Sequence, residues 1–205
     1  MKRVRVHQHV NPLAKFYREL PVRPVELADS FENPDQMIHI DIGCGRGRLL
    51  LKSAEQDKSR NFLGLEIRKP LVDEANQIAK ERGHSNLHYV FCNAPLDFNK
   101  VMSNIPSERI ELVTIQFPDP WFKKRHRKRR MVDENLARAI REKLPKTARL
   151  FFQTDVEEVF KDFSETLMNA GFSMDPVESS ILDFKTEREI SVEERNLAVY
   201  RAIFG

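Results

Sequence analysis

A carboxylate and a dense cationic run stand side by side in this sequence. Asp119 lies between two prolines and is followed by the only tryptophan, Trp121, and then by seven Lys or Arg residues within positions 123–130. Unpaired charges are costly to desolvate, so the run is expected on the surface, facing a polyanion. Removing these seven charges from the net charge of +3 leaves −4, so the positive charge is concentrated at one place. The pattern favours an enzyme that acts on nucleic acid; a solvated charge run and an import signal are the alternatives.

A second group of polar residues follows three predicted strands. Asp41 precedes a glycine-rich turn, Glu66 ends the next strand, and Asn93 follows the third. The third glycine of the turn comes one residue earlier than in a dinucleotide fingerprint, so the turn suits a ligand with an amine better than a diphosphate. Glu66 is placed to bind ribose hydroxyls and Asn93 an adenine edge, although each alone could be a solvated strand end or a turn residue. The predicted residues of this nucleoside-cofactor site are Asp41, Gly43, Gly45, Gly47, Glu66, Asn93 and Ala94.

Strands that alternate with helices must position these residues. Apolar patterns predict strands over residues 37–42, 61–66, 87–92, 110–117 and 148–153, with a weaker final strand within 196–204. Helices are predicted around 49–54 and over 71–82, 132–144 and 155–170. This alternation predicts an α/β fold with a parallel sheet and helices on both faces. Ligands in such sheets bind beyond the carboxyl ends of the strands, which is where the polar residues fall.

Length and composition limit the remaining possibilities. A chain of 205 residues with 40% hydrophobic and 32% charged residues is typical of a soluble, single-domain protein. We interpret residues 1–31 as a basic N-terminal arm and residues 32–205 as the domain. No apolar run approaches the roughly 18 residues of a membrane span, and the N-terminus lacks an apolar signal core, so we expect a cytoplasmic protein with no membrane partner. Cys44, Cys92 and the six histidines show no metal-ligand spacing, so no metal is expected.

The full string F-P-D-P-W-x-K-K-R-H-x-K-R-R at residues 117–130 resembles the signature of the tRNA (guanine-N7-)-methyltransferases. Further segments that resemble this family are Val4–His7 with Asn11–Leu13, Gln153–Asp155 and Thr186–Glu189. The resemblance covers nearly the whole chain. It implies a Rossmann-like class I methyltransferase fold with a mostly parallel seven-stranded sheet. It also implies transfer of a methyl group from S-adenosylmethionine to N7 of a guanine in the variable loop of tRNA (position forty-six).

The resemblance also implies roles for individual residues. Asp119 would be catalytic, and Asp41, Glu66 and Asn93 would hold the cofactor. The predicted contacts to guanosine or its backbone are Lys123, Asp155, Thr186 and Glu189, and the predicted phosphate contacts are Arg125, Arg127, Arg129 and Arg130. A helix-capping box is the competing interpretation at Thr186–Glu189. The chain departs from the family at Asn196, where many members have glycine, and at residues 145–147, which lack the usual glycines.

The chemistry implied by the resemblance needs a single acid. Guanine N7 has an exposed lone pair and no proton to remove, so transfer requires mainly positioning, and a carboxylate at Asp119 would stabilise the charge that develops on the purine. Trp121 is either a stacking partner for a base or a core anchor. A methyltransferase for another base or for a protein, and a non-catalytic RNA-binding scaffold, are the other interpretations. The sequence leaves open a monomer or a homodimer, and a need for a partner subunit.

Overall fold

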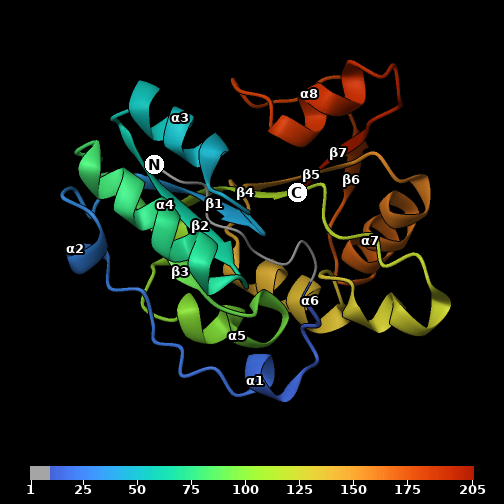
Figure 1. Ribbon diagram of the computed structural model, residues 1–205, viewed down its shortest axis with the longest axis horizontal. Helices are drawn as coiled ribbons and strands as arrows, with labels where there is room; N and C mark the ends of the chain where they lie inside the picture. Colours follow the sequence, from blue (N-terminus) through green and yellow to red (C-terminus); the bar gives the residue numbers. More distant parts are fainter. Residues whose placement is uncertain (1–9) are drawn as a thin grey trace.

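Seven strands form one sheet in the order β3-β2-β1-β4-β5-β7-β6 (Figure 1). The structure is a computed structural model that describes residues 10–205. Strands β1 to β5 pair in parallel, and β7 runs antiparallel between β5 and β6. The strands are β1 (Met37–Ile42), β2 (Arg60–Glu66), β3 (Leu87–Phe91), β4 (Ile110–Gln116), β5 (Arg149–Thr154), β6 (Met174–Pro176) and β7 (Tyr200–Phe204). The predicted mostly parallel, seven-stranded sheet is therefore confirmed.

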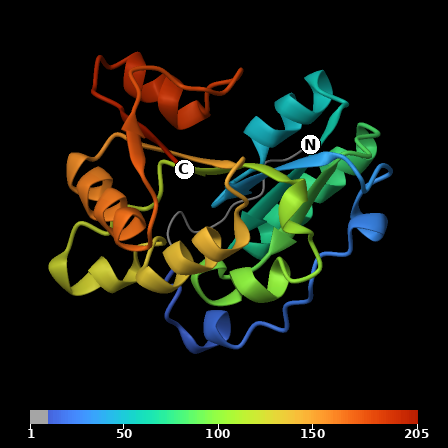
Figure 2. The ribbon, with the colours of Figure 1, turned by 180° about the vertical axis from the view of Figure 1, so that it is seen from behind.

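Helices cover both faces of the sheet (Figure 1 and Figure 2). They are α1 (Lys15–Arg18), α2 (Leu27–Ser30), α3 (Arg48–Gln56), α4 (Lys69–Glu81), α5 (Ala94–Val101), α6 (Glu134–Lys143), α7 (Glu157–Asn169) and α8 (Glu187–Glu193), with 3-10 helices η1 (Ser107–Arg109) and η2 (Lys124–Arg129). On one face, α3 and α4 share a buried cluster that includes Leu50 and Val72. On the other, α5, α6 and α7 share a larger cluster that includes Phe98, Ile140 and Phe163. Within residues 10–205, no helix is both long and apolar enough to cross a membrane.

The central strands bring the polar residues of the site to one edge. All residues of β1 except the first are buried, and its isoleucines at 38, 40 and 42 suit a pleated, fully covered strand. Parallel strands end on the same side of a sheet, so Asp41 on β1, Glu66 on β2, Gln116 on β4 and Thr154 on β5 all lie near its carboxyl edge. This edge is where ligands are expected in an open α/β sheet.

Part of the segment interpreted as an N-terminal arm packs on the domain. Val22, Val25 and Phe31 belong to the larger core cluster. The backbone N–H of Val25 donates to the carbonyl oxygen of Val101 at 2.9 Å, which ties the segment to the end of α5. The part of the arm before residue 10, with the predicted family match at residues 4–7, lies outside the described residues.

Several short elements were not predicted, among them α5 and β6. Helix α5 has eight residues with a proline at its start, and β6 has three residues, so neither produces a clear periodic pattern. Asn196 has a φ of 53°, in the left-handed region. Asparagine is enriched there among non-glycine residues, so the chain can take a glycine-like path at this position.

Candidate active site

The carboxyl edge of the sheet carries a pocket and a neighbouring cleft. The pocket has an empty volume of about 740 Å³, including space open to solvent, a size usual for small-molecule sites. The corresponding volume of the cleft is about 1820 Å³. Five residues line both: Gly43, Arg68, Phe117, Pro118 and Asp119. Asp119 therefore stands where a group bound in the pocket would meet a group bound in the cleft.

Asp41, the next-to-last residue of β1, is buried and lines the cleft. The hydroxyl of Thr114 donates to its Oδ1 at 2.7 Å, and Nε2 of Gln116 donates to the same oxygen at 3.5 Å. Burial raises the pKa of Asp41 to about 6, although both hydrogen bonds lower it. A carboxylate held in this way favours a cationic ligand group, because a nearby positive charge would offset the cost of its burial.

Glu66, the last residue of β2, lines the pocket with its carboxylate fully engaged. Its Oε1 accepts from the backbone N–H and the Nε of Arg68, both at 2.9 Å. Its Oε2 accepts from Nη2 of Arg68 and from the backbone N–H of Gly45, also at 2.9 Å. A carboxylate offers about four acceptor positions, so ribose hydroxyls can bind Glu66 only if the Arg68 guanidinium moves.

Asn93 and Ala94 line the pocket at the start of α5. The side-chain Nδ2 of Asn93 donates to the carbonyl oxygens of Pro12 and Tyr17, both at 3.0 Å. Its Oδ1 is buried and accepts no hydrogen bond from residues 10–205. The N-terminal segment thus orients the amide, and one acceptor is left for a donor such as the amino group of a base.

The glycines of the turn after β1 differ in their surroundings. Gly43 lines both cavities and Gly45 lines the cleft, as expected for residues near a ligand. Gly47, predicted to bind the cofactor, lines neither of them. A Cβ added to Gly47 would lie 2.3 Å from the ring of Tyr89, whose hydroxyl donates to the Gly47 carbonyl at 2.6 Å. In this structure Gly47 allows close packing of the turn against β3, and a contact with the cofactor stays a prediction.

The loop that carries Asp119 is held in an unusual backbone conformation. Phe117 has a φ of 46° and Trp121 a φ of 44°, values that L-residues with large side chains rarely adopt. Such conformations persist only where the surroundings enforce them, and they occur often at active sites. The guanidinium of Arg129 lies 5.1 Å from the centre of the Trp121 ring, and His126 meets the ring edge-on. Trp121 therefore anchors η2 beside Asp119.

The cationic run forms η2, and its members differ in accessibility. Lys123, Arg125, Arg127 and Lys128 are exposed, whereas Arg129 is half-buried against Trp121. Arg127 also pairs with a carboxylate of α7, that of Glu158, at 2.7 Å. The exposed members are available to phosphate groups.

Arg130 does not match the prediction of a surface phosphate contact. It is only 5% exposed, and its Nη1 and Nη2 pair with Asp162 at 2.7 Å and with Glu158 at 3.0 Å. Its Nε donates to the carbonyl oxygen of Pro120 at 2.9 Å. In this structure Arg130 ties the Asp119 loop to α7, and its contact with phosphate stays a prediction.

The residues predicted on the substrate side also separate into two groups. Asp155 and Thr186 line the cleft, and Asp155 pairs with Arg188. Thr186 is the N-cap of α8 and accepts from the backbone N–H of Glu189 at 3.1 Å, so the predicted helix cap is present. Glu189 is fully buried, is not among the residues that line the cleft, and binds Arg201 and Gln153. Glu189 thus belongs to a buried network in this structure, and its contact with guanosine stays a prediction.

Several residues in or next to the site were given no role from the sequence. Arg68 lines both cavities, and its position two residues after Glu66 was the available signal. Gln116 and Gln153 each lie near the end of a predicted strand. A polar residue within an apolar run was the signal that could have identified them. Arg201 lies in the weakly patterned tail, where no local signal marks it.

The strand order, the glycine turn and the polar strand ends define a Rossmann-like fold that known methyltransferases share. The fold is similar to a SAM dependent methyltransferase from Aquifex aeolicus, with a TM-score of 0.56 and 13% identity over 82% of this chain and 81% of that one. It is also similar to a precorrin-6y C5,15-methyltransferase from Geobacter metallireducens, with a TM-score of 0.57 and 13% identity over 87% and 84% of the two chains.

Sequence relatives identify the family. The model of a family described as putative methyltransferase matches residues 35–202. A tRNA (guanine-N(7)-)-methyltransferase from Synechococcus elongatus is 46% identical, over 100% of this chain and 97% of the relative. A relative of the same name from Trichormus variabilis is 44% identical over 98% and 95%. The chain belongs to the tRNA (guanine-N(7)-)-methyltransferase family, which confirms the resemblance of its motifs.

Proposed function

We propose that this protein transfers a methyl group from S-adenosylmethionine to N7 of a guanine in the variable loop of tRNA, in the cytoplasm. One observation carries the proposal: Asp119 lines both the pocket and the cleft and directly precedes the exposed cations of η2. A carboxylate between two cavities, beside a surface suited to a polyanion, fits a group transfer to RNA. The names of the sequence relatives support the same reaction.

The residues of the site fit S-adenosylmethionine. The buried carboxylate of Asp41 suits its ammonium group. The unpartnered Oδ1 of Asn93 suits the adenine amino group. Glu66 suits the ribose once Arg68 has moved aside, and glycines at 43 and 45 allow close approach to the backbone. When bound, the cofactor supplies an electrophilic methyl group on a sulfonium.

The protein contributes position and electrostatics. Guanine N7 needs no general base, because it has a lone pair and no proton, so holding it in line with the methyl group provides much of the rate enhancement. Positive charge develops on the purine during transfer, and the carboxylate of Asp119 is placed at the junction to stabilise it. The constrained backbone at Phe117 and Trp121 keeps this carboxylate fixed before the substrate arrives.

The exposed cations of η2 are expected to hold the RNA backbone. The double variant Arg125→Ala/Arg127→Ala should weaken tRNA binding and flatten the slope of log affinity against log salt by about 1.4–1.8, because each phosphate contact contributes roughly 0.7–0.9. Filter binding over a salt series measures the slope. Lys80→Ala/Arg82→Ala, at the exposed end of α4, is the matched control and should leave it unchanged. An unaltered slope in the η2 variant would exclude both arginines as phosphate contacts.

Arg130 is expected to behave differently from its neighbours. Arg130→Met leaves Glu158 and Asp162 without their shared cation and releases Pro120, so Tm should fall by roughly 3–10 °C. The neighbouring substitution Arg125→Ala removes an exposed charge and should change Tm by less than about 2 °C. Thermal melting of the two variants side by side tests this difference. Equal melting temperatures would show that the Arg130 ion pairs do not stabilise the fold.

The proposed reaction is tested with an unmodified tRNA transcript and S-adenosylmethionine labelled in its methyl group. Digestion of the RNA to nucleosides then shows which nucleoside carries the label. Label in 7-methylguanosine is the expected result. Label in another nucleoside would overturn the proposed substrate atom, and cofactor binding without any label would favour an RNA-binding scaffold or a required partner subunit.

A further inference from the structure

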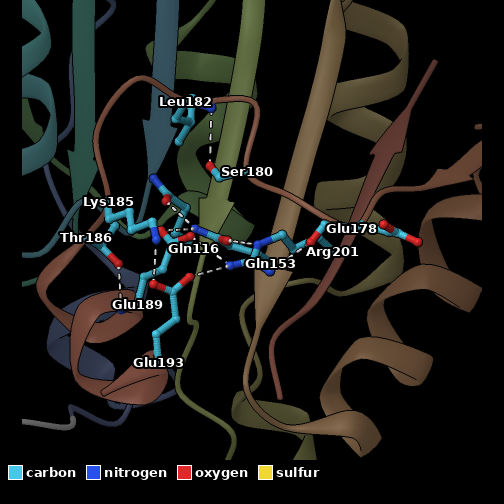
Figure 3. Close-up of polar contacts among 10 residues, drawn as sticks. All are labelled: Gln116, Gln153, Glu178, Ser180, Leu182, Lys185, Thr186, Glu189, Glu193 and Arg201. Carbon is cyan, nitrogen blue, oxygen red and sulfur yellow. Dashed lines mark hydrogen bonds and ion pairs between the residues drawn. The ribbon is translucent and has the colours of Figure 1, made fainter. Parts of the chain in front are cut away.

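A buried polar network crosses the sheet where apolar side chains are usual (Figure 3). Gln116 on β4, Gln153 on β5 and Arg201 on β7 come from three neighbouring strands, and Glu189 joins them from α8. Gln153 and Glu189 are both 0% exposed. Polar and charged groups are expensive to bury unless partners satisfy them, so this arrangement is a specific structural feature.

The side chains of the network satisfy one another's hydrogen-bonding groups. Nε2 of Gln153 donates to Gln116 Oε1 at 2.9 Å and to Glu189 Oε2 at 3.0 Å. Oε1 of Gln153 accepts from Nε of Arg201 at 3.0 Å. Nη2 of Arg201 donates to Glu189 Oε1 at 2.9 Å, so both oxygens of Glu189 are engaged. Gln153, Glu189 and Arg201 thus form a closed ring that fixes the position of the Glu189 side chain relative to β5 and β7.

The network connects the two sides of the active site. At one end, Nε2 of Gln116 reaches Oδ1 of Asp41 at 3.5 Å. At the other, Glu189 lies in the first turn of α8, whose N-cap Thr186 lines the cleft. Helix α8 has seven residues, too few to be stable alone, and only Glu189 and Val192 among them are buried. The side chain of Glu189 is therefore one of two buried attachments that hold α8 against the sheet.

We propose that Arg201, through Glu189 and Gln153, is a positioning residue that keeps α8 and the Thr186 wall of the cleft in place for the tRNA guanine. The inference rests on the proposed function, since it takes the part of the cleft beside α8 as the acceptor site. Arg201 is not among the residues that line the pocket or the cleft. Its loss should therefore act through α8 and affect tRNA binding. The network reaches Asp41 only through the 3.5 Å contact of Gln116, which Arg201 does not touch, so cofactor binding should stay unchanged.

Two variants separate positioning from stability. Arg201→Met leaves Glu189 buried without its cation, and Tm should fall by roughly 10 °C. Arg201→Met/Glu189→Met removes both charges, so less than about half of that loss is expected. In both variants, KM for tRNA should rise about tenfold, because the wall of the cleft is no longer fixed. The Kd of S-adenosylhomocysteine, measured by calorimetry, should stay within about threefold of the wild-type value.

Arg109→Met is the matched control. Arg109 pairs with Asp35 at 2.8 Å, and these two residues precede β4 and β1, away from the cleft. The control should therefore leave both KM for tRNA and Kd of S-adenosylhomocysteine unchanged. A double variant with wild-type KM for tRNA would overturn the proposal, and so would a parallel loss of affinity for S-adenosylhomocysteine. If the wild-type protein places no methyl group on tRNA, the proposed function is wrong, but the role of Arg201 is not yet contradicted. The Kd of tRNA, measured directly for the wild type and both variants, then tests the positioning role.

Discussion

Asp119→Asn is expected to lower kcat for tRNA methylation by roughly 10²–10³-fold, the usual loss when one preorganised electrostatic group is removed. Asparagine keeps the size of the side chain but carries no charge to stabilise the purine as it becomes cationic. The affinities for S-adenosylhomocysteine and tRNA should stay within about threefold of wild type, because ground-state contacts are made mainly by other residues. Single-turnover rates at saturating tRNA, with both affinities measured separately, provide the test.

The control for this variant is Asp175→Asn, an equivalent change on the exposed edge strand β6. It should leave the rate, both affinities and Tm unchanged. Near-normal turnover of Asp119→Asn on saturating tRNA would exclude the electrostatic role. A fall in tRNA affinity with an unchanged rate would instead make Asp119 a residue for binding the guanine.

Asp41→Asn is expected to weaken binding of S-adenosylhomocysteine by roughly 100-fold, since a buried charge pair with the ligand ammonium is lost. In the wild-type protein the affinity should be constant above about pH 7 and fall by up to about tenfold per pH unit below pH 6. The reason is that burial raises the pKa of Asp41 to about 6, and only the ionised carboxylate pairs with the cation. Calorimetric titrations between pH 5 and pH 8 measure both effects, and the variant should lose this pH dependence.

The same carboxylate is expected to destabilise the free protein. Its pKa is about 6 in the folded state and near its ordinary value of 3.8 in the unfolded state, so the folded state binds more protons between these values. The free energy of unfolding is therefore least affected by this carboxyl group below pH 4. About 3 kcal/mol of it is lost as the pH rises from about 4 through 6. Asp41→Asn should consequently melt no lower than the wild type at pH 7.5. A clear fall in Tm together with the loss of affinity would show that Asp41 mainly supports the fold.

The strands and helices that carry the site could be predicted from the sequence because their apolar patterns are long. The runs at residues 37–42 and 110–117 appear as the two central strands, to within one residue at their ends. Helix α5 and strand β6 could not be predicted, since both are short and both contain a proline. Pairing with the sheet and burial against neighbouring elements stabilise them, and a single sequence carries little information on such contacts.

The sequence predicted which residues lie at the carboxyl edge of the sheet, but not what their side chains contact there. Asp41, Glu66 and Asn93 meet at one edge because parallel strands end there. What each side chain contacts depends on residues distant in sequence. Arg130 pairs with carboxylates that lie 28 and 32 residues later, and a partner of Glu189 is on the last strand. The cationic run therefore placed Arg130, and the family resemblance placed Glu189, on the ligand-binding surface. Glu66 was expected to face the ribose, but the nearby Arg68 covers it.

We propose that the pocket and the cleft meet at Asp119 so that one nitrogen atom of one guanine is methylated. The most direct measurement uses a tRNA in which only the variable-loop guanine is replaced by 7-deazaguanine, which has a C–H group in place of N7. This tRNA should bind about as tightly as the unmodified transcript, within about threefold, and should accept no label from S-adenosylmethionine. Label transferred to the substituted tRNA at the normal rate would contradict the proposal, because the methyl group would then be going to another atom or another nucleotide.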